Sequence, residues 1–520
     1  MAASQPIPVY TQLKDVFQDT ATALAQGPRW NNLIEEFTQR YGRKPEYIAR
    51  APGRVNLIGE HIDYALFGVF PAAVERDILM AVAGREEHDP GRITADNLDG
   101  KYSRQTFAPI KNHVQEWELD IDKTQLRWES YVKAGYYGVL GKFFNSNEDV
   151  PKGVDLLVTG SVPAGSGLSS SAAMVVASTL SFLAINQRLD GISKGDLVNI
   201  TVSNERRVGV NSGGMDQSAS VISAAGAALY VSFFPLLSAE PIPLPITAPR
   251  SVFVCANSLV VSDKVVHAKT RYNLRVVETL AAARVLGRRL GVKMANDEKI
   301  TMREVLDRWL GVKPGEELEV AALKSGLERI SKEIDGLKLV ESDGSDGTET
   351  GLTLEELIEL SGLSASDFKQ IYLSWVDIEA THFQLYKRSK HVFSEAWRVL
   401  EFRDICLRTA EGNQSHDTLR QLGKLMDESQ TSCAELYECS CPELDELTHL
   451  AKEAGAYGSR LTGAGWGGCT VSLVEESRVE EFITKVKAGY PAYHGLHGGA
   501  LHEVIFATKP SSGACLFKLT

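Results

Sequence analysis

Cysteines are few in this sequence, basic residues are outnumbered by acidic ones, and long apolar runs are missing. The 520 residues include seven cysteines, too few for a disulfide framework in a chain of this length, and reduced thiols fit the cytoplasm. Lysine and arginine number 55 against 67 aspartates and glutamates, which gives a formal net charge of -12. Because a duplex-binding surface usually carries a basic excess, we expect no direct nucleic-acid partner.

The first residues lack the features of a targeting segment. MAASQPIPVYTQLKDVF has neither a basic n-region nor an apolar h-region, so it does not resemble a secretory signal. No apolar run in the sequence is long enough to span a bilayer. We therefore expect no membrane association and a cytoplasmic location.

The most closely spaced cysteines are Cys433, Cys439 and Cys441 in the stretch CAELYECSC. A zinc site needs a fourth ligand at a suitable spacing, and the nearest histidines, His416 and His449, do not provide that pattern. We predict that these cysteines are small core or surface thiols.

The length predicts two domains, because single cores rarely grow beyond about 250–300 residues. We place the boundary after the proline-rich stretch EPIPLPITAPR and before the strand-like stretch SVFVCANSLVVS. The predicted domains are residues 1–250 and 251–520.

Short apolar runs and turn residues predict several strands and helices. Tyr47–Gly59 predicts a strand that enters a glycine turn, Gly68–Glu86 predicts two successive strands, and Gly153–Val162 predicts another. Ser169–Leu189 predicts a helix. A second helix, which is amphipathic, is predicted to begin at Tyr272 and to end before Gly291. The acidic, glycine-rich segment Glu341–Gly351 predicts a mobile surface loop without a catalytic role.

The stretch PAGSGLSSSAAMVV places small polar residues directly before an apolar helix. Gly165 and Gly167 allow a bulky ligand to approach the backbone, and Ser169, Ser170 and Ser171 add hydroxyls at the helix start. A helix N-terminus attracts anions, so the pattern is typical of a phosphate site. It is not a Walker motif, because no Gly-Lys-Ser/Thr follows. The residues alone also allow a cluster of N-caps on a buried helix.

The stretch APGRVNLIGEHIDY gathers Arg54, Glu60, His61 and Asp63 around a glycine turn. A polyhydroxylated ligand needs many hydrogen-bond partners, so this density of polar side chains indicates a sugar site. A metal site is the alternative that Glu-His-x-Asp suggests, but further ligands are not nearby. A charged surface turn is the alternative without a function.

The stretch GSRLTGAGWGGCTVSL carries Gly463, Gly465, Gly467 and Gly468 ahead of a predicted strand. These glycines allow close backbone packing against another loop or a ligand. In NERRVGVNSGGMDQSAS, Asp216 follows two glycines, and its carboxylate could accept a hydroxyl proton. A buried structural aspartate or an N-cap is the alternative interpretation of Asp216.

Taken together, these motifs resemble the GHMP kinase superfamily and, within it, the galactokinase family. APGRVNLIGEHIDY is similar to the galactokinase signature, PAGSGLSSSAA to the ATP loop of the superfamily, and LTGAGWGGCTVSL to its third motif. The resemblance covers nearly the whole chain from about Trp30 onward, and DYALFG and the overall length are most similar to fungal members. It implies a two-domain α/β (α+β) GHMP kinase fold with mixed sheets and an active site at the domain interface.

The resemblance also implies an activity and a role for individual residues. The activity is the phosphorylation of the anomeric hydroxyl of galactose by ATP, the first phosphorylation step of galactose catabolism (the Leloir pathway). Asp216 would be the catalytic base, and Arg54 would keep it ionised and stabilise charge on the phosphoryl group. The implied sugar contacts are Arg54, Glu60, His61, Asp63, Gly213, Asp216 and Tyr272. The implied ATP contacts are Gly165, Gly167, Ser169, Ser170, Asn257, Ser258 and, at the adenine, Trp128. The implied Mg²⁺ ligands are Ser171 and Glu205.

Two alternatives stay open from the sequence. An N-acetylgalactosamine kinase shares all three motifs and would differ in the pocket near the second carbon of the sugar. Some yeast relatives are sugar sensors that bind a transcriptional repressor, and their non-catalytic paralogue has a shortened serine loop. Because GLSSSAA is complete here, we expect catalysis to be intact. We expect a monomer that binds galactose and ATP, with a repressor protein as a possible further partner.

Overall fold

The computed structural model describes residues 2–85, 90–113, 116–122, 125, 127–145, 149–209, 213–261, 268–341, 351–410 and 416–519. The predicted acidic loop lies outside the described residues, apart from its two ends, Glu341 and Gly351. Among the described residues, no helix combines the length and the apolar character that crossing a membrane requires.

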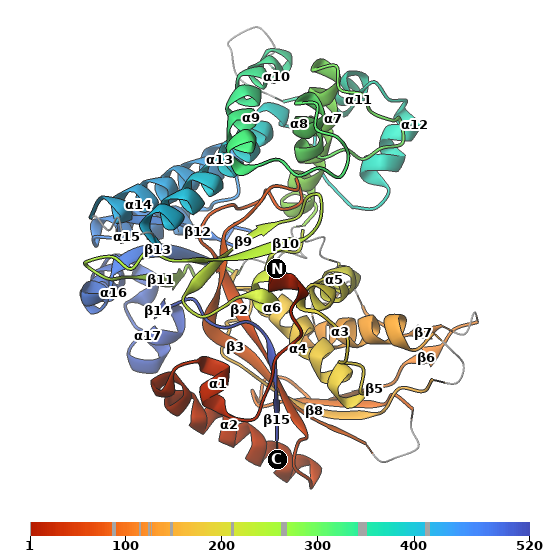
Figure 1. Ribbon diagram of the computed structural model, residues 1–520, viewed down its shortest axis with the longest axis vertical. Coiled ribbons are helices and arrows are strands. Elements are labelled where there is room, and N and C mark those ends of the chain that lie inside the picture. Colours follow the sequence, from red (N-terminus) through yellow and green to blue (C-terminus); the bar gives the residue numbers. More distant parts are fainter. Residues whose placement is uncertain are drawn as a thin grey trace.

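The described residues form a large mixed sheet (Figure 1) that contains both the first and the last strand of the chain. In spatial order its strands are β1 (Val9–Tyr10), β15 (Cys515–Lys518), β2 (Tyr47–Asn56), β3 (Pro71–Gly84), β8 (Val154–Gly160), β4 (Ile93–Asn97) and β5 (Gln105–Phe107). The pairs β1–β15 and β4–β8 are parallel, and the other neighbours are antiparallel. The first strand and the last strand of the chain are therefore neighbours in the same sheet.

The described part of Gly68–Glu86 contains one long strand, so the prediction of two strands was wrong. The central strand β3 runs without interruption through Glu75, Arg76 and Asp77. Alternate residues of this strand are buried on opposite faces of the sheet, with Leu79 on one side and Met80 on the other, in separate apolar clusters. A strand that is covered on both faces is apolar at nearly every position, which hides the two-residue period in the sequence.

Helices cover both faces of this sheet (Figure 1). On one face lie α1 (Leu13–Phe17) and α2 (Thr20–Tyr41), whose Trp30 is fully buried against the sheet. On the other face lie α3 (Trp128–Phe143), α4 (Ser170–Ile185), α5 (Lys194–Glu205) and α6 (Met215–Ile222). The helix predicted for Ser169–Leu189 is α4, shorter by one residue at its start and four at its end.

A second sheet begins at Ser251, the residue where the sequence placed the domain boundary. Its antiparallel strands are, in order, β12 (Gly458–Thr462), β13 (Cys469–Glu475), β11 (Ser251–Asn257) and β14 (Ile505–Thr508). The helices near it are α13 (Leu385–Ala410), α14 (His416–Thr431), α15 (Pro442–Glu453), α16 (Val479–Gly489) and α17 (Gly498–Val504). The last strand, β15, returns to the first sheet, so it does not follow the predicted division. For the rest of the chain, the boundary between residues 250 and 251 stays a prediction.

Two strand pairs and a group of α-helices lie outside these two sheets. The pairs join β6 (Ile110–Lys111) to β7 (Trp117–Glu118), and β9 (Ala227–Ser232) to β10 (Ser238–Pro243). The helices at the top of Figure 1 are α7 (Tyr272–Arg289), α8 (Met302–Trp309), α9 (Val320–Glu333), α10 (Asp335–Glu341), α11 (Leu354–Ser361) and α12 (Ala365–Phe368). As predicted, α7 begins at Tyr272, and Gly291 follows its end with a φ of 70°.

Candidate active site

The three motifs that lie far apart in the sequence meet at the end of strand β2. The pairing of β2 with β3 shifts between Pro52 and Arg54, where Gly53 alone lies opposite the three β3 residues Val74, Glu75 and Arg76. A Cβ atom on Gly53 would lie 2.6 Å from the carbonyl oxygen of Leu168, which is why glycine is needed where the serine loop approaches. The backbone N–H of Arg54 then donates to this carbonyl oxygen at 3.1 Å.

Arg54 and Asp216 form a buried ion pair between β2 and the start of α6. The Nε and Nη2 atoms of Arg54 lie 2.9 and 2.7 Å from Oδ1 of Asp216. Nη1 of Arg54 donates to the carbonyl oxygen of Gly167 at 2.6 Å. One guanidinium therefore connects the candidate base with the serine loop. Asp216 is the second residue of α6, behind Gly214 at the N-cap position, so the N-cap alternative for Asp216 is wrong.

The glycine-rich third motif packs against the serine loop, backbone to backbone. A Cβ atom on Gly463 would lie 2.5 Å from the carbonyl oxygen of Gly167, and one on Gly468 would lie 2.8 Å from that of Ser166. Neither position could hold a larger residue without moving the loop. The sequence allowed either another loop or a ligand as the partner of these glycines, and in the structure the partner is another loop.

The serine loop presents the N-terminus of α4. Ser169 is the N-cap residue, in the left-handed region with a φ of 59°, and its side chain forms no capping bond. Its hydroxyl is buried without a hydrogen-bond partner among the described residues, while Ser170 and Ser171 are half-buried. The N–H groups in the first turn of any helix have no partner within the helix. Together these donors suit an anionic ligand such as a phosphate.

Glu60 is held by the third motif. Its Oε1 accepts the N–H of Gly463 at 2.8 Å and lies 3.5 Å from Nη1 of Arg460. Burial raises the pKa of Glu60 above its usual value, although the charges of Arg460 and Arg54 oppose this shift. Glu60 therefore connects the sugar signature to the third motif.

His61 lies in a group of aromatic rings. Its φ is 61°, and its ring is stacked on Tyr437 at a centroid distance of 4.7 Å. One ring nitrogen, Nδ1, lies 3.0 Å from the hydroxyl of Tyr64. The other, Nε2, lies 2.9 Å from the carbonyl oxygen of Ala464, so Nε2 carries the proton and donates. Both nitrogens of His61 are thus within hydrogen-bond distance of protein groups.

Asp63, Gly213 and Tyr272 lie together beside Asp216. A Cβ atom on Gly213 would lie 2.4 Å from Oδ2 of Asp63, so only glycine fits against this carboxylate. Burial, followed by the negative charges of Asp63 and Asp216, raises the pKa of the Tyr272 phenol well above its usual value. The phenol is therefore a protonated donor beside two carboxylates at neutral pH.

Glu205 is the last residue of α5, and it is buried where α5 meets α6. Its Oε2 accepts a hydrogen bond from Nε2 of Gln217. Among the described residues, no three His, Cys, Asp or Glu side chains are grouped as a metal site. The oxygen donors of Glu205 and Ser171 suit Mg²⁺, which usually takes one or two protein ligands plus phosphate and water oxygens.

Asn257 and Ser258 lie at the end of β11, next to the third motif. The N–H of Ser258 donates to the carbonyl oxygen of Gly468 at 2.8 Å, and Oδ1 of Asn257 accepts the N–H of Leu259 at 2.9 Å. Trp128 is the first residue of α3, and its ring centroid is 6.1 Å from that of Tyr102. Among the described hydrogen bonds and ring contacts, none connects Trp128 with the serine loop.

Several residues in contact with the site were not identified from the sequence. Arg460 donates to the carbonyl oxygen of Asn56 at 3.0 Å, and Tyr437 packs on His61. His391 and Glu395 of α13 contact the loop that carries Glu60. A signal available in the sequence was the spacing of His391 and Glu395, which puts them one helical turn apart on the same face.

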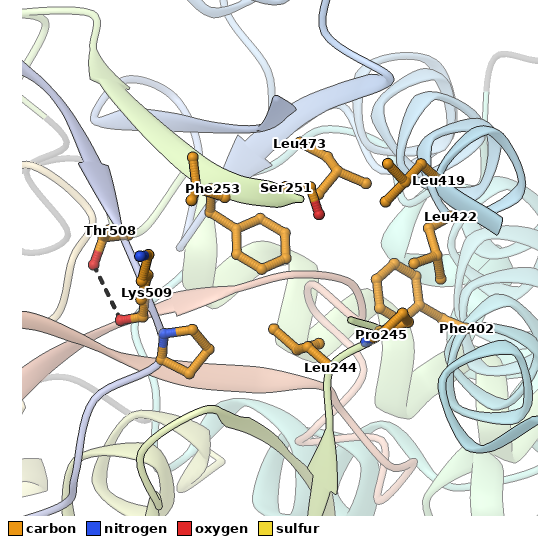
Figure 2. A pocket seen from close by; sticks show the side chains of 12 residues that line it. Leu244, Pro245, Ser251, Phe253, Phe402, Leu419, Leu422, Leu473, Thr508 and Lys509 are labelled. Carbon is orange, nitrogen blue, oxygen red and sulfur yellow. Dashed lines mark hydrogen bonds between the residues drawn. The ribbon is translucent and has the colours of Figure 1, made fainter. Parts of the chain in front are cut away.

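An apolar pocket lies elsewhere, between the second sheet and helices α13 and α14 (Figure 2). Its volume is about 50 Å³, room for one or two water molecules, and Phe253, Phe402 and Leu422 are among its lining side chains. No residue that the sequence predicts for the site lines it. The pocket is too small and too apolar for a sugar or a nucleotide.

Models of known families match three parts of the chain. The model described as the galactokinase galactose-binding signature matches residues 35–84, the GHMP kinases N-terminal domain matches residues 130–224, and the GHMP kinases C-terminal model matches residues 414–492. These ranges contain the sugar signature, the serine loop with Asp216, and the third motif.

Curated relatives are similar over nearly the full length. A galactokinase from Saccharomyces cerevisiae is 38% identical, and 94% of each chain is covered. One from Candida parapsilosis is 36% identical, with 95% of each chain covered. Among solved structures, a Lactococcus lactis galactokinase in complex with galactose has a TM-score of 0.65 at 24% identity, covering 93% of this chain and 99% of its own. The predicted fold class is thereby confirmed.

Proposed function

Because the chain belongs to the galactokinase family of the GHMP kinases, we propose that it transfers the γ-phosphoryl group of ATP to the anomeric hydroxyl of galactose. The products are galactose 1-phosphate and ADP. The observation that carries the proposal is the buried pair of Arg54 and Asp216 beside the serine loop. This pair supports the proposal because it offers a carboxylate to a sugar hydroxyl and a cation to a phosphate.

This geometry supports a role for each of the two residues. Phosphoryl transfer has a loose transition state, so positioning and charge stabilisation contribute most of the rate enhancement. Asp216 orients the anomeric hydroxyl and accepts its proton late in the reaction. Arg54 touches both Asp216 and the carbonyl oxygen of Gly167, so its charge lies between the acceptor and the phosphates.

ATP binds at the N-terminus of α4 in this proposal. Gly165, Gly167, Ser169 and Ser170 hold its phosphates through backbone N–H groups and hydroxyls. The remaining ATP contacts that we propose are Asn257, Ser258 and, at the adenine, Trp128. Ser171 and Glu205 would hold Mg²⁺, which neutralises charge on the phosphates when it is bound.

Galactose binds between the sugar signature and α7 in this proposal. Asp63 and Tyr272 provide an acceptor and a donor beside Asp216, and the backbone at Gly213 completes this side. Glu60 and His61 lie behind them, held by the third motif. We further propose that the protein is a cytoplasmic monomer. Binding of a repressor protein is a separate hypothesis, and the proposed reaction does not require it.

The decisive experiment measures ADP formation with galactose, N-acetylgalactosamine and glucose in separate assays. We expect turnover with galactose and little with the other two sugars. Preferred turnover of N-acetylgalactosamine would assign the alternative kinase activity. Absence of turnover with all three sugars, in a protein that binds ATP, would contradict the proposed function.

The serine loop provides a second test. Replacing both Ser169 and Ser170 with alanine should weaken ATP binding about tenfold or more, because hydrogen bonds to charged groups are worth about 1.5–3 kcal/mol each. Direct binding of galactose should stay nearly unchanged, and calorimetry with each ligand measures both. Ser181→Ala is the control, since this buried hydroxyl of α4 donates to the carbonyl oxygen of Ala177 at 2.8 Å and lies 3.9 Å from the sulfur of Met80. Loss of galactose binding with ATP binding intact would contradict the assignment.

A further inference from the structure

We propose that His391 of helix α13 is a positioning residue for the sugar site, which holds the backbone of the loop from Gly59 to Tyr64 in its binding conformation. The inference rests on the proposed function, because that loop carries the expected sugar contacts Glu60, His61 and Asp63. Helix α13 lies in the C-terminal half of the chain and outside the three motifs, and the inference gives it a role in the sugar site.

His391 contacts the loop through its backbone. Its Nε2 lies 3.0 Å from the carbonyl oxygen of Glu60, and its Nδ1 lies 2.8 Å from the hydroxyl of Ser432. A carbonyl can only accept, so Nε2 carries the proton and donates, and Nδ1 accepts from Ser432. Burial lowers the pKa of His391 to about 4, so the ring is neutral at pH 7 and keeps this tautomer.

Glu395 holds the preceding residue of the loop, Gly59. It lies one turn after His391 on α13, and its Oε1 accepts the N–H of Gly59 at 2.8 Å. Its own position is fixed by Ser429, which donates to Oε1 at 2.6 Å, and by Arg398, which lies 2.7 Å from Oε2. Two side chains of one helix face thus hold two consecutive residues of the loop.

The loop needs such support because its backbone is unusual. Gly59 has a φ of 109°, and the non-glycine residue His61 has a φ of 61°. Left-handed conformations in non-glycine residues cost energy and persist where surrounding contacts hold them. The two bonds from α13 precede His61 directly, so they set the direction in which His61 and Asp63 enter the site.

The ring of His391 also packs behind the site. Its centroid is 4.4 Å from that of Tyr437, which is stacked in turn on His61. A test of the hydrogen bond must therefore remove the ring in both variants and restore only the donor. Glutamine can place an amide N–H near the position of Nε2, whereas asparagine reaches only the position of Nδ1.

The experiment compares His391→Asn with His391→Gln in the full-length protein. We expect His391→Asn to raise the KM for galactose and the calorimetric Kd about tenfold, the loss expected for one buried hydrogen bond. His391→Gln should stay within about threefold of the wild type, because the donor to Glu60 is restored. The KM for ATP should change less than about twofold in both variants, since no described contact joins His391 to the serine loop.

Glu278→Gln is the matched control. Glu278 is a buried carboxylate that accepts the N–H of Gln384 at 2.8 Å and pairs with Arg388 of α13 at 2.7 Å, without a described contact to residues 59–64. It should lower stability and leave the KM for galactose unchanged.

Two results would overturn the inference. One is equal galactose affinity in His391→Asn and His391→Gln, and the other is an equal rise in the KM values for galactose and ATP. Either result, in a protein whose wild type phosphorylates galactose, leaves the proposed function standing. A wild type without galactose turnover would contradict the proposed function instead.

Discussion

Replacing Asp216 with asparagine is expected to lower the turnover number at least about a hundredfold, the lower range for the loss of a general base. The substitution keeps the shape of the side chain and removes its charge and its capacity to accept a proton. Galactose binding should be largely retained, because Asp63, His61 and Tyr272 remain in place. Steady-state kinetics gives the turnover number, and calorimetry gives the sugar affinity.

Arg54→Lys is the companion variant. Lysine keeps the positive charge but cannot contact Asp216 and the carbonyl oxygen of Gly167 at once with a planar fork, so it should also be damaging. Near-normal turnover of Asp216→Asn at neutral pH would show that Asp216 is not the base. Asp63 would then be the first alternative, since Glu60 already accepts the N–H of Gly463 and lies next to Arg460.

The largest expected effect on stability comes from Asp77 in β3. Its carboxylate is fully buried, with Nη1 of Arg29 at 2.6 Å from Oδ1 and Nε of Arg50 at 2.6 Å from Oδ2. Arg50 is also fully buried and donates to Ser511 at 3.1 Å. Asp77→Asn leaves the Arg50 charge without its partner, so we expect the free energy of unfolding to fall by about 3–5 kcal/mol. Urea unfolding at pH 7 measures this difference.

The control is an exposed pair. Asp99 lies 2.7 Å from Nζ of Lys101 with both side chains exposed, so Asp99→Asn should change the free energy of unfolding by less than about 1 kcal/mol. An effect of Asp77→Asn as small as that of Asp99→Asn would contradict the prediction.

The pH dependence of the same variant has a definite sign. Burial alone would raise the pKa of Asp77, but the charges of Arg29 and Arg50 outweigh it and lower the pKa below its usual value. A carboxylate with a lowered pKa in the folded state stabilises the protein above its unfolded pKa, about 3.9 for aspartate, and loses that contribution as the pH falls further. The difference in stability between wild type and Asp77→Asn should therefore be constant near neutral pH and shrink below about pH 4.

The sequence by itself determined the motifs and the chemistry they imply. Small polar residues before an apolar helix indicated an anion site, and the structure places a buried hydroxyl without a described partner there, on Ser169. The glycines of the third motif indicated a close backbone approach, and Gly463 and Gly468 face the serine loop. These features are readable because they depend on local residue types, such as glycine where a Cβ atom would clash.

Only the tertiary structure decided which distant groups meet. Asp77 lies in a polar stretch of the sequence, yet it sits fully buried within β3 because Arg29 and Arg50 arrive from α2 and β2. His391 and Glu395 resemble ordinary polar residues of a helix until α13 packs on the loop from Gly59 to Tyr64. β15 joins the first sheet although it is last in the chain. The physical reason is that burial of charges and backbone groups is stable only with partners, and those partners are supplied by long-range packing that no local pattern records.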